Sequence, residues 1–159
     1  MTILGIDPGI ARCGWGVIET NGQKITVKNY GCIETESTME VSLRLSVIYR
    51  EITGLIKKYS PDALALEELF FNTNAKTAFV VGQARGAVLL AGAENSLKNY
   101  VYTPLQVKIA VTGYGRAEKE QVGKMVKTIL SLEKIPKPDD TADALAIALT
   151  HAFSAKMPK

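Results

Sequence analysis

The sequence lacks the long apolar run that a membrane-spanning helix needs. No stretch of the 159-residue chain reaches about 18 consecutive apolar residues. The N-terminus also lacks a basic segment followed by an apolar one, the pattern typical of a secretory signal peptide. These absences predict a cytoplasmic protein with no membrane-spanning segment.

Cysteine and histidine are scarce as well. The chain contains two cysteines, Cys13 and Cys32, and a single histidine, His151. Both cysteines lie in strand-like stretches, so we expect buried free thiols and neither a disulfide nor a Cys/His metal site. His151 lies two helical turns beyond Asp143 and is expected to be structural. Carboxylates are therefore the candidate ligands for any metal ion.

What the chain does have is an ordinary globular composition with an uneven charge. Hydrophobic residues make up 47% of the sequence and charged residues 22%, which predicts one domain over residues 1–155 and a disordered tail over 156–159. Residues 98–137 carry eight basic and three acidic residues, a net charge of +5, whereas the remainder carries −2. A basic segment beside acidic residues suits an enzyme that acts on a polyanion through metal ions, although a solvated helix face explains the lysines nearly as well.

Hydrophobic patterning predicts an α/β domain. Strands are expected at residues 2–7, 13–19 and 24–33, and Asn21-Gly22 predicts a hairpin between the second and third of them. Apolar residues then recur at helical spacing over 39–59, and a fourth strand follows at 63–67. The first three strands should therefore be antiparallel.

The second half alternates helices with one more strand. An apolar, Ala- and Gly-rich helix over 75–97 belongs either in the core or against a second subunit, and a fifth strand is expected at 99–103. A short helix at 104–111, a loop at 112–116 and a helix at 118–132 follow, and a last helix begins at Asp139 or Asp140 and ends near Phe153. The pattern predicts a five-stranded mixed sheet flanked by helices.

Two carboxylates each end an apolar strand. Asp7 precedes Pro8-Gly9 and could be a simple turn residue, and Glu67 ends the fourth strand. Sites in α/β folds gather beyond the carboxyl ends of strands, so Asp7 and Glu67 converge if their strands are neighbours. Glu68 is an alternative to Glu67, because adjacent strand residues face opposite ways.

Three further carboxylates stand at the start of the last helix. Asp140 and Asp143 share a helix face, and so do Asp139 and Asp143. Helix capping explains one of these residues but not Asp143, which lies within an alanine-rich, core-like helix. Three or four carboxylates without His or Cys select Mg²⁺ or Mn²⁺, and two such ions can promote phosphodiester cleavage.

Six motifs occur in order along nearly the whole chain: Gly5-Ile6-Asp7-Pro8-Gly9, Leu66-Glu67 with Phe70, Gly82-Gln83-Ala84-Arg85-Gly86, Gln106-Val107-Lys108, Ala117-Glu118-Lys119, and Asp140-Thr141-Ala142-Asp143-Ala144-Leu145-Ala146. This pattern resembles that of the RuvC Holliday-junction resolvases, which have the ribonuclease H-like fold. It implies a homodimeric, Mg²⁺-dependent endonuclease that resolves four-way DNA junctions by two symmetric nicks in recombination and repair. A branch-migration helicase complex is the implied protein partner.

The resemblance also implies a role for individual residues. Asp7, Glu67, Asp140 and Asp143 would hold two metal ions and carry catalysis, which selects Glu67 over Glu68 and Asp140 over Asp139. Some family members have His at the position of Asp140. Phe70 would stack on an unpaired base, and Lys108 and Lys119 would hold phosphates. The DNA-binding set is completed by residues near these motifs and in the basic segment: Asn74, Arg116 and Lys124. Without the resemblance, Phe70 is more simply a core aromatic and the lysines are surface residues.

Two other classes of protein share part of this pattern. Phosphotransferases of the actin and sugar-kinase type also open with an Asp-x-Gly strand and hairpin, but they need two such domains to enclose ATP. A non-catalytic junction-binding module is the second alternative, and four placed carboxylates argue against it because carboxylates repel DNA unless metal ions intervene.

Overall fold

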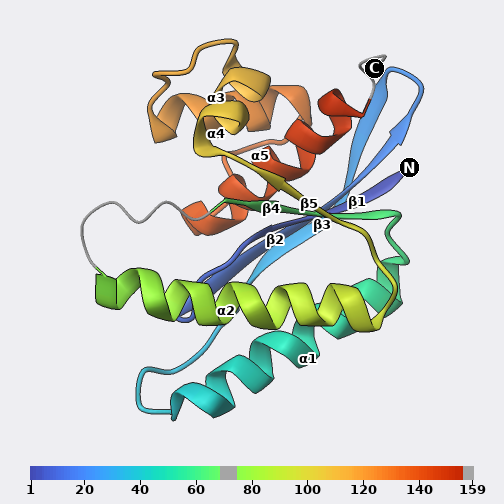
Figure 1. The fold of residues 1–159 in the computed structure, drawn as a ribbon. Helices are drawn as coiled ribbons and strands as arrows, with labels where there is room; N and C mark the ends of the chain where they lie inside the picture. The colour runs from blue at the N-terminus through green and yellow to red at the C-terminus, as the bar shows by residue number, and fades with distance from the viewer. Residues whose placement is uncertain (69–74, 156–159) are drawn as a thin grey trace.

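A five-stranded mixed sheet forms the centre of the protein in a computed structural model that describes residues 1–68 and 75–155 (Figure 1). The strand order is β3-β2-β1-β4-β5, with β1, β2 and β3 antiparallel and β1, β4 and β5 parallel. This confirms the predicted mixed sheet. The strand bounds are β1 Thr2–Asp7, β2 Arg12–Asn21, β3 Lys24–Glu34, β4 Ala63–Glu67 and β5 Asn99–Tyr102.

Helices cover both faces of the sheet. Figure 1 shows α1 (Val41–Tyr59) and α2 (Ala75–Glu94) on one face and α3 (Pro104–Thr112), α4 (Lys119–Ile129) and α5 (Asp139–Ser154) on the other. Each face has its own core. Leu4 and Ile6 of β1 pack towards α1 and α2, whereas Ile3 packs with α5. The alternation of β1 between two apolar layers follows from its period of two, and explains why the strand reads as a continuous hydrophobic run.

Several helices are shorter than their apolar periodicity predicts. The helix expected over 75–97 ends at Glu94, and the one expected over 118–132 ends at Ile129. Ser96 and Ser131, with φ angles of 56° and 52°, adopt the left-handed conformation just beyond these ends, which cannot continue a helix. The hairpin matches its prediction, with Gly22 at φ 59° between the paired Asn21 and Lys24.

The scarce residue types also have defined places. Cys13 is buried and Cys32 is half-buried, and both are free thiols. His151 is 4% exposed, its Nδ1 lies 2.6 Å from the Tyr102 hydroxyl, and its ring packs against Tyr100. These contacts support the structural role expected for His151. Within the described residues, no helix has the length and apolar character that crossing a membrane requires. The tail predicted to be disordered, 156–159, lies outside those residues.

Candidate active site

Asp7 and Glu67 lie side by side at one edge of the sheet. Their strands β1 and β4 are parallel neighbours, and the last paired residues immediately precede the two carboxylates. Ile3 of β1 and Ala65 of β4 both pack in the core on the α5 side. Because side chains alternate along a strand, Asp7 and Glu67 face α5, and Glu68 belongs to the opposite side. The side of the sheet that α5 covers therefore distinguishes Glu67 from Glu68.

Glycines let α5 lie against the sheet at the same edge. A Cβ atom built on Gly14, which pairs with Asp7, would be 2.0 Å from the carbonyl oxygen of Asp140. One built on Gly5 would be 2.2 Å from the carbonyl oxygen of Ala144. No side chain fits in either space, so glycine permits an approach that any other residue would block.

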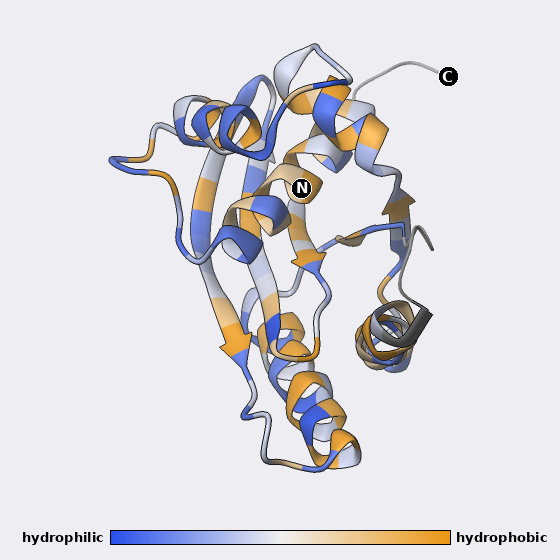
Figure 2. Cartoon of the chain, turned by 90° about the vertical axis from the view of Figure 1, so that its left-hand side faces the viewer, coloured by the Kyte–Doolittle hydropathy of each residue, from blue (hydrophilic) through white to orange (hydrophobic). Residues whose placement is uncertain are grey.

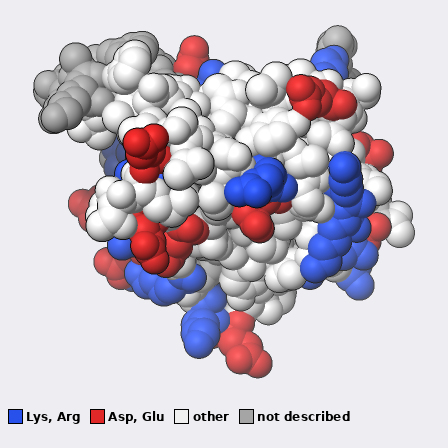
Figure 3. Space-filling view, turned by 90° about the horizontal axis from the view of Figure 1, so that it is seen from below, with Lys and Arg blue, Asp and Glu red and all other residues white. Residues whose placement is uncertain are grey.

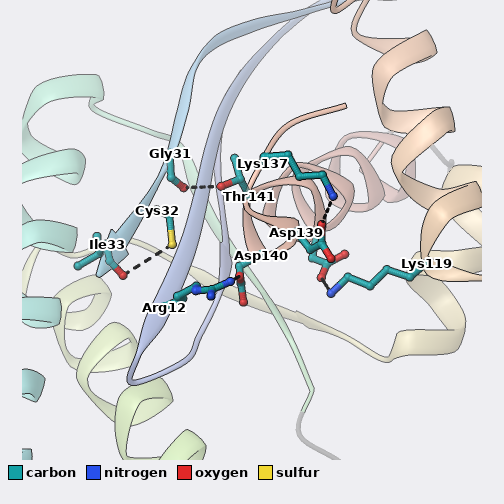
Figure 4. A network of polar contacts seen from close by, with 10 residues as sticks. Arg12, Gly31, Cys32, Ile33, Lys119, Lys137, Asp139, Asp140 and Thr141 are labelled. Atoms are coloured by element: carbon teal, nitrogen blue, oxygen red, sulfur yellow. Dashed lines mark hydrogen bonds and ion pairs between the residues drawn. The ribbon is translucent and has the colours of Figure 1, made fainter. Parts of the chain in front are cut away.

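A hydrogen bond fixes the first turn of α5. The Thr141 hydroxyl donates to the Gly31 carbonyl of β3 at 3.2 Å, as Figure 4 shows. From this turn the helix runs across the sheet over Gly14 and Gly5. Asp140 and Asp143, three residues apart, share the face that the helix turns towards the strand ends. The fold thus joins carboxylates from β1, β4 and α5, which are up to 136 residues apart in the sequence.

The four carboxylates act on one another electrostatically. Burial raises the pKa of Asp7 to about 7, and the charges of Asp143, Glu67 and Asp140 add to this shift. Burial also raises the pKa of Glu67 and of Asp143, and the charge of a neighbouring carboxylate adds to each shift. Such a cluster is strained without a compensating cation, because like charges in a partly desolvated site disfavour ionisation.

Lys119 supplies one positive charge to this cluster. Its Nζ lies 2.7 Å from Oδ2 of Asp143, and Figure 4 shows the side chain reaching across to the start of α5. Burial acts to lower the pKa of Lys119, but the hydrogen bond to Asp143 and the surrounding carboxylates outweigh it and raise this pKa. Lys119 is the first residue of α4, whose N-terminus is held by a capping box between Glu118 and Gln121.

A pocket of about 190 Å³ opens between these groups. Its charged lining residues are Glu67, Asp143, Lys108 and Lys119, and apolar residues of α3, α4 and α5 complete it. Lys108 belongs to α3, which begins with a capping box formed by Thr103 and Gln106. The predicted phosphate-binding lysines and two of the predicted carboxylates therefore share one hollow.

Asp139 pairs with a lysine outside the cluster, although its charge adds to the raised pKa of Asp143. Its Oδ1 accepts a hydrogen bond from Lys137 Nζ at 2.6 Å, and its side chain is 53% exposed. Asp140, by contrast, lies 3.8 Å from the guanidinium of Arg12 and contributes to the pKa shift of Asp7. The two neighbouring aspartates thus take different surroundings, an outcome that their helical spacing alone left open.

The remaining predicted DNA contacts lie elsewhere. Lys124 pairs with Glu120 at 2.6 Å on the exposed side of α4, and Arg116 is exposed in the preceding loop. Neither lines the pocket of the carboxylates. Phe70 and Asn74 lie outside the described residues.

Sequence reasoning missed Arg12, the first residue of β2. Its guanidinium reaches Asp140 from the far side of the turn that follows Asp7 (Figure 4). A basic residue near a turn is common on any protein surface, and its partner lies 128 residues away. The only available signal was its position five residues after Asp7.

The chemistry of the donor set fits a hard cation. Four carboxylates with no imidazole or thiolate among them are the ligands that Mg²⁺ and Mn²⁺ prefer. In residues 1–68 and 75–155, no three acidic, His or Cys side chains already stand where they could hold one metal ion together. One oxygen of Asp143 is instead occupied by the ammonium of Lys119.

Known proteins resemble this chain over nearly its whole length. The family model described as "Crossover junction endodeoxyribonuclease RuvC" matches residues 3–151. A protein of that name from Alkaliphilus oremlandii is 56% identical over 97% of this chain and 94% of its own length. Another from Desulforamulus reducens is 58% identical over 96% and 93%.

Solved structures agree with the sequence relatives. The Thermus thermophilus RuvC structure is 41% identical, with a TM-score of 0.92 over 99% of this chain and 96% of that one. T. thermophilus RuvC in complex with Holliday junction substrate is 42% identical, with a TM-score of 0.94 and the same coverage. The yeast mitochondrial resolvase Ydc2, at 15% identity and a TM-score of 0.66, shares the fold. The family model and the relatives place this chain in the crossover junction endodeoxyribonuclease RuvC family.

Proposed function

We propose that Asp7, Glu67, Asp140 and Asp143 carry the endonuclease activity of this family and cut four-way DNA junctions by two symmetric nicks. One observation carries the proposal: Asp7 and Glu67 end neighbouring strands on the side of the sheet that α5 covers, and the charges of Asp143, Glu67 and Asp140 add to the burial that raises the pKa of Asp7 to about 7. Carboxylates with raised pKa values are typical of functional sites, and a bound cation would offset their charge.

Mg²⁺ is the cation that we assign to this cluster, with Mn²⁺ as a substitute and two ions per site. When bound, such ions supply an activated water and stabilise the leaving oxygen of a phosphodiester. Asp7 and Glu67 are the better-fixed ligands, because both extend from strand ends within the sheet. Asp140 and Asp143 extend from the first two turns of α5 and would close the cluster from above.

The chain's own cations hold the substrate. Lys108 and Lys119 line the pocket beside Glu67 and Asp143, where a phosphate drawn to the cluster would meet two ammonium groups. Lys119 also neutralises part of the acidic charge through its ion pair with Asp143. Arg116 and Lys124 lie farther out and would contact an arm of the junction. The base-stacking role of Phe70 and the DNA contact of Asn74 stay predictions.

Two copies of the chain would make the paired cuts. One chain offers one carboxylate cluster, so two nicks related by symmetry call for a homodimer. The apolar helix α2 supports this assignment. Phe79 and Leu90 are 67% and 53% exposed, and a Cβ atom added at Gly86, between them in the sequence, would meet no atom within 4 Å. Figure 2 shows hydrophobic residues on more than one side of α2. Action on DNA fits the predicted cytoplasmic location, and the helicase complex stays a predicted partner.

The direct experiment uses a four-way junction and a linear duplex, each with and without Mg²⁺. We expect the protein to cut the junction but not the linear duplex, and only when Mg²⁺ is present. The cuts should be pairs of nicks at symmetric positions. Asp7→Asn should bind the junction within a few-fold of the wild-type affinity yet leave it uncut, because binding depends on basic residues. Cleavage by Asp7→Asn at the wild-type rate would show that Asp7 is not a catalytic residue.

A further inference from the structure

A second hollow of about 610 Å³ adjoins the carboxylate cluster. Its walls are the turn between β1 and β2, residues Val80 and Val81 of α2, and the side chains of Arg12 and Asp140. It shares no lining residue with the smaller pocket that holds Lys108 and Lys119. Asp143 lines the smaller pocket and Asp140 this groove, so the cluster lies between the two.

Arg12 is positioned by backbone packing at the mouth of this groove. A Cβ atom on Gly9 would lie 2.3 Å from the carbonyl oxygen of Arg12, so the turn is closed tightly against the first residue of β2. The Arg12 side chain is nevertheless 57% exposed. Its base is therefore fixed while its guanidinium remains accessible.

The pairing of Arg12 with Asp140 leaves the guanidinium available. Their closest nitrogen–oxygen distance is 3.8 Å, longer than a hydrogen bond. The Arg12 side chain is exposed and the pair is long, so water screens the attraction and the guanidinium can turn towards another anion. Figure 4 shows Arg12 extending alongside Asp140 at the edge of the site.

A second cationic side chain is needed on the groove side of the carboxylate cluster, because DNA is negatively charged along its whole backbone. A DNA strand that brings one phosphate to four carboxylates must carry its next phosphate past them as well. On one side Lys108 and Lys119 are in place. In the groove, Arg12 and Asp140 are the charged groups among the described lining residues. Its other walls are largely apolar and suit a sugar or the edge of a base, and its volume falls within the range of small-molecule sites.

We propose that Arg12 binds the backbone phosphate next to the one that is cut, and that the groove holds the nucleotide between them. The inference rests on the proposed function of the carboxylate cluster. The planar fork of a guanidinium matches two phosphate oxygens, so the contact is bidentate and specific to arginine. Arg12 is thus a substrate-binding residue that places the cleaved strand over Asp140.

The test pairs protein variants with altered DNA. An immobile four-way junction carries one neutral methylphosphonate at a time, at matching positions of both cleaved strands within about three phosphates of the cut. Affinity is measured without divalent metal ions for the wild type, Arg12→Gln, Arg12→Lys and Lys28→Gln. Lys28 is the control because it also forms an exposed ion pair, with Glu19 at 2.5 Å, near the opposite end of the sheet.

We expect one flanking methylphosphonate to weaken wild-type binding roughly tenfold, the range for a hydrogen bond to a charged group. The same substitution should have no further effect on Arg12→Gln, which already lacks the contact, and Arg12→Lys should be intermediate. Lys28→Gln should behave as the wild type. If every methylphosphonate weakens Arg12→Gln as much as the wild type, the proposed contact does not exist.

Cleavage kinetics separate this contact from the role of the cluster. With Mg²⁺, Arg12→Gln should need roughly ten times more protein for half-maximal single-turnover cleavage, while its rate at saturation stays within about threefold of wild type. A reduced saturating rate with unchanged affinity would mean that Arg12 acts only through Asp140, which overturns the proposal. Failure of the wild type to cut the junction would instead overturn the proposed function, and a thermal melt confirms that each variant is folded.

Discussion

At the scale of single residues, Asp7 is a carboxylate whose charge the fold opposes. Its pKa is 3.8 in an unperturbed aspartate and about 7 here. Between these values the folded protein binds a proton that the unfolded chain has released. The contribution of the neutral carboxyl to the free energy of unfolding is therefore fully present below about pH 4, and it is lost as the pH rises through 7.

Asp7→Asn should consequently stabilise the metal-free protein at high pH. The variant removes the charge that burial and three carboxylates oppose, so its free energy of unfolding at pH 8 should exceed that of wild type by a few kcal/mol, about 1.4 kcal/mol per pKa unit. The difference should vanish near pH 4. Thermal melts from pH 4 to 8 in EDTA measure it. Equal melting temperatures at pH 8 would mean that Asp7 is not under electrostatic strain.

Lys108 and Lys119 are expected to contribute phosphate contacts. Lys108→Ala and Lys119→Ala should each weaken junction cleavage and reduce the slope of log affinity against log salt by about one. Titrations over a range of salt concentrations give the slope, and Lys28→Ala, remote from the site, should leave it unchanged. An unaltered slope in both variants would mean that these lysines are merely solvated.

At the scale of elements, the approach of α5 to the sheet determines where Asp140 and Asp143 lie. Gly14→Ala would place a Cβ atom 2.0 Å from a backbone oxygen of the helix, which can move only if the first turn of α5 moves. We expect a stability loss of about 1–3 kcal/mol, as for other overpacked sites, together with cleavage reduced more than tenfold at temperatures where the variant is folded.

Gly54→Ala is the matched control for that variant. Gly54 lies within α1, and an added Cβ would meet no atom within 4 Å. Alanine favours a helix over glycine by about 1 kcal/mol, so this change should raise the melting temperature and leave cleavage intact. If Gly14→Ala behaved in the same way, close packing of α5 would not be what positions the aspartates.

The elements were largely predictable from the sequence, whereas their contacts were not. Asp7 and Glu67 could be identified because each ends an apolar strand. The assignment of Glu67 over Glu68 depends on which face of β4 packs against α5, and the sequence around β4 does not indicate that face. Arg12 was missed for the same reason, since its partner Asp140 comes from a distant helix. The lengths of α2 and α4 were overestimated because apolar residues continue past the serines that end them.

At the scale of the whole molecule, the unpartnered face of α2 is the expected dimer surface. Figure 3 shows uncharged surface between groups of acidic and basic side chains on the molecular face that includes α1 and α2. Phe79→Glu combined with Leu90→Glu should convert a dimer into a monomer in sedimentation experiments, because the charges would be buried against the partner. Leu105→Glu, at a residue 56% exposed on α3 across the sheet, should leave the dimer intact.

Sedimentation of the wild type sets the baseline for this comparison. A wild type that sediments as a 17.2 kDa monomer both free and with junction DNA would contradict the dimer. A double variant that remains dimeric would move the interface away from α2.

The most direct test of the proposed active site compares variants of neighbouring carboxylates in single-turnover cleavage of a four-way junction with Mg²⁺. Glu67→Gln and Asp140→Asn should each lower the rate by about a hundredfold or more, because each removes a proposed metal ligand. Glu68→Gln and Asp139→Asn, one residue away but outside the cluster, should remain within about threefold of wild type. Equal losses within either pair, or near-normal cleavage by Glu67→Gln or Asp140→Asn, would contradict the assignment of the active site.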